Sequence, residues 1–194
     1  MRRLIIGMSG ATGAIYGIRL LEILRQHGDL ELHLVISKPA ELTIRLETDY
    51  SVEQVAALAH VRHDVRDLGA SISSGSFLTD GMVVAPCSMR TLSGIANSFN
   101  DNLLVRAADV ILKERRRLIL VPRESPLHLG HLRLMTQVTE MGAIVVPPMP
   151  AFHTRPSSVD DIVNYTVARL LDLLGVEHHG ISQRWAGAES YPER

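Results

Sequence analysis

Short apolar runs alternate with longer amphipathic segments along this chain. The runs are built from consecutive Leu, Ile, Val, Ala and Met residues, as in strands that are buried on both faces of a sheet. Between them, apolar residues recur every three or four positions, which indicates helices. This pattern predicts strands at residues 4–8, 32–36, 82–85, 118–121 and 143–146, and helices at 14–27, 53–59, 88–96, 103–113, from about 129 past 137, and 159–174 with a cap near Gly175.

Strands that alternate with helices predict a parallel sheet covered on both faces. We therefore expect an α/β fold, a Rossmann-like (flavodoxin-like) doubly wound sheet in three α/β/α layers. The chain has 194 residues, which fits a single domain with a substantial core. We expect that domain at residues 1–175 and a C-terminal tail at 176–194, which is polar apart from Ile181 and Trp185.

Charge and cysteine content narrow the class of protein. The 20 basic residues nearly balance the 21 acidic ones, so the broad basic field that nucleic-acid binding needs is not expected. The apolar run before Gly7 is too short for a signal peptide, and no run reaches the roughly 20 apolar residues that span a bilayer. Cys87 is the one cysteine, which suits a reducing compartment. We expect a soluble, cytoplasmic protein.

The first strand-to-helix turn, Gly7-Met-Ser-Gly-Ala-Thr-Gly-Ala14, is rich in glycine. Backbone N–H groups at the start of the helix could receive a phosphate there, with Ser9 and Thr12 as further donors; the alternative is a turn kept small for packing. Ser37 and Lys38 follow the second strand, where an NAD-binding protein carries an acid, so NAD is disfavoured. NADP stays open through Lys38, although the reductase pattern Tyr-x-x-x-Lys is absent.

A second cradle follows the strand at 82–85, in the segment Pro86-Cys-Ser-Met-Arg-Thr91. Ser88 can cap the next helix, whose free N–H groups then face the same crevice. Two cradles on parallel strands predict one ligand that spans them. Cys87 could be a nucleophile, but its small and apolar neighbours argue against a reactive thiol.

The strand at 118–121 runs directly into Pro122-Arg123-Glu124, and prolines 147, 148 and 150 follow the next strand. An acid and a cation at the carboxyl end of a strand predict chemistry on an anionic substrate. Arg106 and Lys113 are two turns apart on one helix, so they either reach a phosphate together or belong to a solvated face.

Three further features have two interpretations each. The small, polar segment 71–80 is either a mobile ligand loop or a solvated connection. The pairs His60/His63 and His128/His131 have a spacing that could bind a metal, but no third ligand is evident in the sequence. The alternative is that these histidines lie at the surface or serve packing.

Together these motifs resemble the UbiX-type flavin prenyltransferases, formerly described as phenylacrylic acid or polyprenylhydroxybenzoate decarboxylases. The resemblance covers residues 3–185. It rests on the segments at 7–17, 37–38, 47–49, 86–92, 106–114, 122–124, 147–152 and 184–185.

The resemblance implies an FMN-binding homododecamer with sites between subunits. Such an enzyme transfers a dimethylallyl group from dimethylallyl monophosphate to N5 and C6 of reduced FMN, without a metal, and the prenylated FMN serves a separate UbiD-type decarboxylase. It implies FMN contacts at Gly10, Ala11, Thr12, Ser37, Ser88, Met89, Arg90, Thr91 and Arg123. It implies contacts to the prenyl phosphate at Arg106, Lys113, Arg123, Glu124, His153 and Arg169, and catalytic roles for Glu47, Lys113 and Glu124.

One position departs from the family pattern: His153 follows Ala151-Phe152 where the family has tyrosine. An imidazole can donate one hydrogen bond and adds charge when protonated, so we expect an altered, pH-sensitive affinity for the donor. The residues leave two other functions open, an FMN-dependent decarboxylase of the phosphopantothenoylcysteine type and a non-catalytic FMN carrier. The residues also leave open whether the donor is a monophosphate or a diphosphate. They leave open whether the pathway is ubiquinone synthesis or aromatic-acid breakdown.

Overall fold

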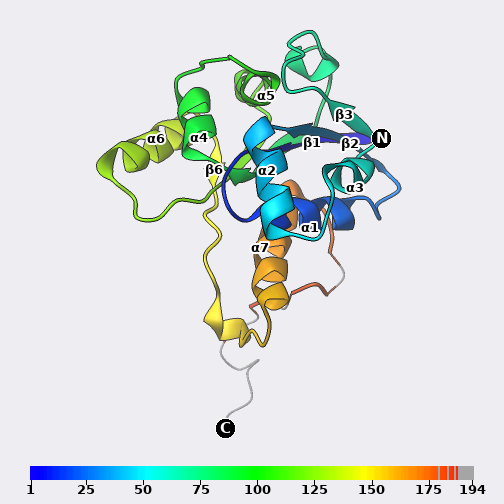
Figure 1. Ribbon diagram of the computed structural model, residues 1–194, viewed down its shortest axis with the longest axis vertical. Coiled ribbons are helices and arrows are strands. Elements are labelled where there is room, and N and C mark those ends of the chain that lie inside the picture. Colours follow the sequence, from blue (N-terminus) through cyan, green and yellow to red (C-terminus); the bar gives the residue numbers. More distant parts are fainter. Residues whose placement is uncertain (179, 183, 186, 188–194) are drawn as a thin grey trace. The chain divides into compact units, whose positions relative to one another are not determined.

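A sheet of parallel strands organises the computed structural model (Figure 1). Its order is β3-β2-β1-β4-β5-β6, so the direction of winding reverses between β1 and β4. Ligands of such sheets bind beside a reversal of this kind, at the carboxyl ends of the strands. The strands are β1 (Arg2–Met8), β2 (Leu30–Ile36), β3 (Val61–His63), β4 (Gly81–Cys87), β5 (Arg117–Pro122) and β6 (Ile144–Val145).

The structure describes residues 1–178, 180–182, 184–185 and 187. The chain forms two compact units, Met1–Pro148 and Met149–Arg194. The first unit holds the sheet with α1 (Ala14–Leu24), α2 (Lys38–Glu47), α3 (Val52–Ala57), α4 (Met89–Ala96), α5 (Leu103–Lys113), α6 (Leu129–Glu140) and the 3-10 turn Ser71–Ser73. The second holds the 3-10 turn Phe152–Thr154 and α7 (Val159–Leu174). The expected boundary at residue 175 stays a prediction.

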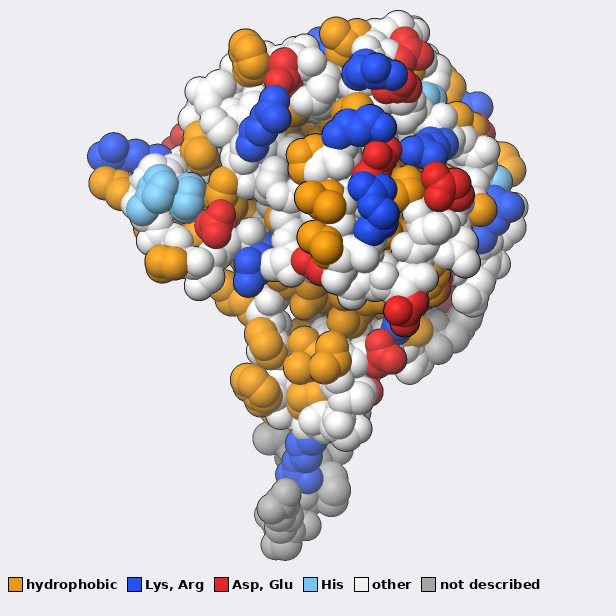
Figure 2. All heavy atoms as spheres, in the orientation of Figure 1, with side chains coloured by type: hydrophobic (Ala, Val, Ile, Leu, Met, Phe, Trp, Pro, Cys, Tyr) orange, Lys and Arg blue, Asp and Glu red, His pale blue; other side chains and the backbone are white. Residues whose placement is uncertain are grey.

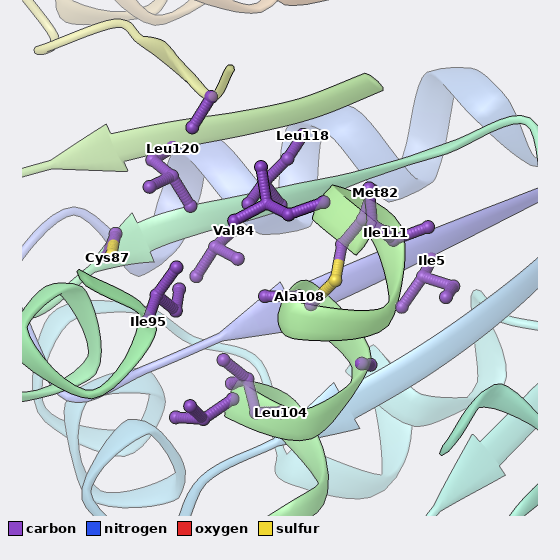
Figure 3. Packing of buried hydrophobic residues seen from close by; sticks show 14 of the residues in the cluster. Ile5, Met82, Val84, Cys87, Ile95, Leu104, Ala108, Ile111, Leu118 and Leu120 are labelled. Carbon is purple, nitrogen blue, oxygen red and sulfur yellow. The ribbon is translucent and has the colours of Figure 1, made fainter. Parts of the chain in front are cut away.

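The two faces of the sheet follow the period of two along each strand. Ile5 of β1 and Met82 of β4 belong to a buried cluster with Leu104 of α5, and Figure 3 shows these side chains between helix and sheet. On the opposite face, Gly17 of α1 lies so near β4 that a Cβ there would meet Ala85 O at 2.2 Å. Helices therefore cover both faces of the sheet, and the doubly wound, three-layer α/β prediction is confirmed.

Two elements, α2 and β3, are not predicted by the sequence pattern. Helix α2 is capped by Ser37, whose hydroxyl accepts a hydrogen bond from Ala40 N, and carries a proline in its first turn. Its Leu42 and Leu46 are exposed, so α2 lacks the apolar stripe that reveals a buried helix. Strand β3 is three residues long, too short for a pattern. Helix α1 also ends at Leu24 rather than at residue 27, because the N–H groups of Gln26 and His27 bond to carbonyls three residues back.

The segment 71–80 is held by hydrogen bonds to side chains elsewhere in the chain, which favours a connection over a mobile ligand loop. The half-buried Arg116 donates hydrogen bonds to Gly75 O at 2.6 Å, Phe77 O at 3.0 Å and Thr79 Oγ1 at 3.3 Å. Arg106 Nε donates to Ser73 O at 3.2 Å. Two arginines, one from α5 and one from the turn after it, thus fix its backbone.

Two observations bear on partners. The face shown in Figure 2 mixes acidic and basic side chains and shows no broad field of one sign. Among the described residues, no helix has the length and apolar character needed to cross a membrane.

Candidate active site

A cavity of about 460 Å³ opens at the carboxyl edge of the sheet, where loops after β1, β2, β4 and β5 meet. This is the position that the reversal of winding between β1 and β4 predicts. The cavity gathers predicted site residues from distant parts of the sequence. Its lining comprises Gly10, Ser37, Lys38, Pro39, Val65, Ser88, Met89, Arg90, Thr91, Asp101, Asn102 and Glu124.

The glycine-rich turn after β1 does not offer α1 as a phosphate cradle. Glu47 Oε2 accepts hydrogen bonds from Gly13 N at 2.8 Å and from Ala14 N at 3.1 Å. A carboxylate from the end of α2 thus already occupies the N-terminus of α1. The expectation that these N–H groups receive a phosphate is therefore corrected, because a side chain 34 positions away takes them.

Ser9 is also engaged within the protein. Its backbone N–H donates to Pro86 O at 3.1 Å and its hydroxyl to the same oxygen at 3.2 Å. The hydroxyl also accepts from Ser88 N at 2.7 Å. Ser9 therefore joins the turn after β1 to the turn after β4. Neither Ala11 nor the exposed Thr12 lines the cavity.

Two serine-capped helix N-termini do line the cavity. Ser88 caps α4 by accepting from Thr91 N at 3.3 Å, and Ser37 caps α2 by accepting from Ala40 N at 3.3 Å. The positive ends of both helices are suited to an anion. The cradle at Ser88 was predicted from the sequence, but helix α2 was not. The signal that could have revealed α2 is Ser37 followed by Lys38-Pro39, since serine caps helices and proline favours the first turn.

Gly10 sets the closest approach between the two sides of this cavity. A Cβ at Gly10 would lie 2.2 Å from the Cβ of Pro39, far inside van der Waals contact. Glycine is therefore required here by space. Asn102, also on the lining, caps α5 by accepting from Val105 N, and Asp101 pairs with the exposed Arg90 at 3.3 Å.

The end of β5 delivers Glu124 to the cavity. Glu124 is exposed, and its Oε1 accepts from Ser125 N at 3.1 Å. Arg123 is exposed beside it, and its backbone N–H donates to Cys87 O at 3.3 Å. Cys87 is fully buried, and burial raises the pKa of its thiol to about 12. A nucleophilic thiolate at Cys87 is thereby disfavoured on physical grounds.

Neither Arg106 nor Lys113 lines this cavity within one chain. Helix α5 starts at Asn102 on the cavity and rises about 1.5 Å per residue, which puts Lys113 roughly 16 Å further along, at the amino end of the strands. Lys113 forms a short contact with Glu114, and Arg106 pairs with Asp109 at 3.1 Å. One subunit therefore does not bring Lys113 to Glu124.

The second unit contains a pocket of its own, of about 400 Å³. It holds the predicted residues His153 and Arg169, and Arg169 pairs with Asp172 at 2.8 Å, as a spacing of three on a helix allows. The ring of Trp185 lies edge-on to His153 with centroids 5.5 Å apart. The lining comprises His153, Tyr165, Ala168, Arg169, Asp172, His178, Ser182, Arg184 and Trp185.

His60 and His63 have other partners, whereas His128 and His131 contact each other. His60 Nδ1 accepts from Leu32 N at 3.0 Å, His63 stacks on His33, and the His128 and His131 rings lie 3.6 Å apart. Within the part of the chain that the structure describes, no cluster of three or more His, Cys, Asp or Glu side chains could hold a metal ion.

Residues 1–171 match the Flavoprotein family. The flavin prenyltransferase UbiX of Escherichia coli (strain K12) is 60% identical over 97% of this chain and 100% of that protein. Two solved structures agree with a TM-score of 0.93. AnUbiX (PadA1) in complex with FMN and dimethylallyl pyrophosphate is 50% identical and covers 96% of this chain and 98% of its own. A dodecameric FMN-dependent Ubix-like decarboxylase from Escherichia coli O157:H7 is 56% identical and covers 95% of this chain and 100% of its own.

The fold is also shared more widely. The FMN-dependent cysteine decarboxylase SpaF has a TM-score of 0.62 at 17% identity, which shows a common fold alone. The identity to the prenyltransferases, in contrast, extends through both compact units. The chain therefore belongs to the UbiX flavin prenyltransferase family, within the flavoproteins.

Proposed function

We propose that this chain is a flavin prenyltransferase, which transfers a dimethylallyl group from dimethylallyl monophosphate to N5 and C6 of reduced FMN. The observation that carries the proposal is the cavity between two serine-capped helix N-termini with Glu124 on its wall, in a chain 60% identical to a UbiX prenyltransferase. The product is prenylated FMN, which a separate UbiD-type decarboxylase uses.

The residues of the cavity suit FMN. A flavin mononucleotide needs an anion site for its phosphate and a flat space for its rings. Ser37 and Ser88 offer helix N-termini for the phosphate, and the turn at Gly10 packs directly against Pro39 beside them. Met89, Arg90 and Thr91 extend the same wall. Reduced FMN, when bound, supplies the nucleophilic atoms N5 and C6.

The protein's own groups assist departure of the phosphate. Lys113, Arg123 and Arg169 neutralise the charge that develops on the leaving phosphate oxygen, as a point charge and two guanidinium forks. Glu124 is the best placed acid for carrying a proton to that oxygen and away from C6 as the new ring closes. Because cations perform this neutralisation, the reaction does not require a metal.

The site is completed by other copies of the chain. Lys113 lies roughly 16 Å along α5 from the cavity lining, so we propose that another subunit supplies it, together with Arg106. A 56% identical relative is described as dodecameric, which supports a homododecamer here. The buried, free Cys87 suits a reducing compartment, and we place the protein in the cytoplasm.

Anaerobic incubation of the purified protein with reduced FMN and dimethylallyl monophosphate, followed by mass spectrometry of the released flavin, tests this function. We expect a gain of one C5H8 unit. Glu124→Gln should retain FMN and slow the transfer. Glu140 is an exposed glutamate at the end of α6, so Glu140→Gln is the matched control and should transfer the prenyl group at the wild-type rate.

Unmodified FMN with the monophosphate, and again with the diphosphate, would refute prenyl transfer. Release of carbon dioxide from a cysteinyl substrate would then favour the decarboxylase. Tight FMN binding without any turnover would favour the carrier.

A further inference from the structure

One carboxylate in the second unit's pocket contacts three basic side chains. Asp172 Oδ2 accepts from Arg169 at 2.8 Å, and its Oδ1 accepts from Arg184 at 2.6 Å. The same Oδ1 lies 3.2 Å from His178 Nε2. The Asp172 side chain is 19% exposed, so both of its oxygens are committed in a largely enclosed position.

Two guanidinium groups that are held near each other repel, and a carboxylate between them offsets most of this unfavourable electrostatic energy. The Arg169 bond uses one terminal nitrogen, and so does the Arg184 bond. A guanidinium carries five N–H donors, so each arginine retains donors that can turn to an anion. The two guanidiniums also exceed the single carboxylate of the lining by one positive charge.

The ion pair between Asp172 and Arg184 also builds the apolar wall of this pocket. Trp185 follows Arg184 directly, and its ring lies edge-on to His153. Tyr165 also lies edge-on to His153, with centroids 5.7 Å apart. Holding Arg184 therefore limits where the next residue, Trp185, can lie, in a pocket that is lined by both cations and aromatic rings.

The charge state of Asp172 agrees with this arrangement. Burial alone would raise the pKa of its carboxyl, but the hydrogen bonds and charges of Arg184 and His178 outweigh that effect and hold the pKa below its usual value. Asp172 is thus ionised at neutral pH, when both arginines are charged.

We propose that Asp172 is a positioning residue for the donor: it holds Arg169 and Arg184 as a pair that binds the phosphate of a small phosphate monoester, and it holds Trp185 against the ester's apolar chain. This inference rests on the proposed function. It adds Asp172 and Arg184 to His153 and Arg169, the two lining residues already expected from sequence to contact the donor.

Trp185 is the one tryptophan of the sequence, so intrinsic fluorescence reports on this pocket directly. We would titrate the FMN-loaded protein with dimethylallyl monophosphate and follow tryptophan emission, for wild type and for Asp172→Asn. Asn keeps the size of the side chain but removes its charge. We expect the dissociation constant for the donor to rise about tenfold, the scale of one lost charge-assisted hydrogen bond, and Trp185 to become more accessible to acrylamide.

The kinetic readouts separate positioning from general stability. In Asp172→Asn, KM for the donor should rise with the dissociation constant, while kcat at saturating donor and the FMN content stay within about twofold of wild type. Asp172→Glu should recover part of the affinity. Asp160→Asn makes the same charge change on the same helix, outside the pocket lining, and should bind the donor as wild type does.

Unchanged donor affinity in Asp172→Asn would overturn the inference, as would a parallel loss of FMN, donor binding and thermal stability. If Asp172→Asn does not fold, Arg184→Gln takes its place, and an unchanged dissociation constant and unchanged quenching there would overturn the inference equally. Failure of the proposed function looks different: wild type would then give no prenylated flavin, whatever the variants bind.

Discussion

Glu47 joins the end of α2 to the start of α1, and replacing it tests whether that contact holds the first turn. Glu47→Ala removes the acceptor for Gly13 N and Ala14 N. Loss of a helix cap costs about 1 kcal/mol, and loss of a negative charge at a helix N-terminus costs about 0.5 kcal/mol at an exposed position such as this one. Together these losses predict about 1.5 kcal/mol of lost unfolding free energy.

For a chain of this length, about 1 kcal/mol corresponds to a shift of roughly 3 °C in melting temperature. We therefore expect Glu47→Ala to melt about 4 or 5 °C below wild type at equal protein concentration. Glu47→Gln keeps an oxygen acceptor and loses the charge alone, so its shift should be about a third as large. Differential scanning fluorimetry measures both.

An added anion gives the sharper assay. With Glu47 removed, the N-terminus of α1 becomes a vacant anion site, so sulfate should raise the melting temperature of Glu47→Ala more than that of wild type, at ionic strength matched with chloride. Equal sulfate responses would refute the reasoning. A Glu47→Gln variant that melts like wild type but transfers the prenyl group slowly would instead place Glu47 in the chemistry.

Three further results are expected. Because burial raises the pKa of Cys87 to about 12, iodoacetamide at pH 8 should label it only after denaturation, and mass spectrometry showing a labelled native protein would contradict its burial. Burial lowers the pKa values of His33 and His63, so the unfolded chain takes up these protons first. The stability that depends on neutral His33 and His63 is present above about pH 6.5 and is lost as the pH falls below that value. The melting temperature should therefore fall as the pH is lowered below about 6.5, and this fall should be smaller in His33→Gln. Finally, His153→Tyr should change KM for the donor with kcat retained, and steady-state kinetics that match wild type would count against a donor contact at this position.

Local signals made much of this fold predictable. The helices α4 and α5 are capped by Ser88 and Asn102, residue types that favour this position. The buried strands are continuous apolar runs. Helix α2 could not be found in the same way, because its leucines face outward and its stability comes from Ser37 and from contact with α1. A pattern that depends on burial does not reveal a helix of this kind.

The site was predictable in part for a related reason. Motifs after strands identify loops at one sheet edge, and that reasoning pointed to Ser88 and Glu124. The family resemblance added Ser37, and all three residues line one cavity. It could not foresee that Glu47 would take the N–H groups of α1, because a side-chain contact across 34 positions leaves no periodic trace. The same holds for Asp172, whose three partners include two from the segment after α7.

Ser9 links the turns after β1 and β4 through its hydroxyl and its backbone. These two turns flank the point where the sheet changes its direction of winding, so the link makes them move as one body before any ligand arrives. Binding then loses little conformational entropy at the floor of the cavity. A ligand that is bound, modified and released in every catalytic cycle can therefore exchange without unfolding and refolding of the two turns that bind it.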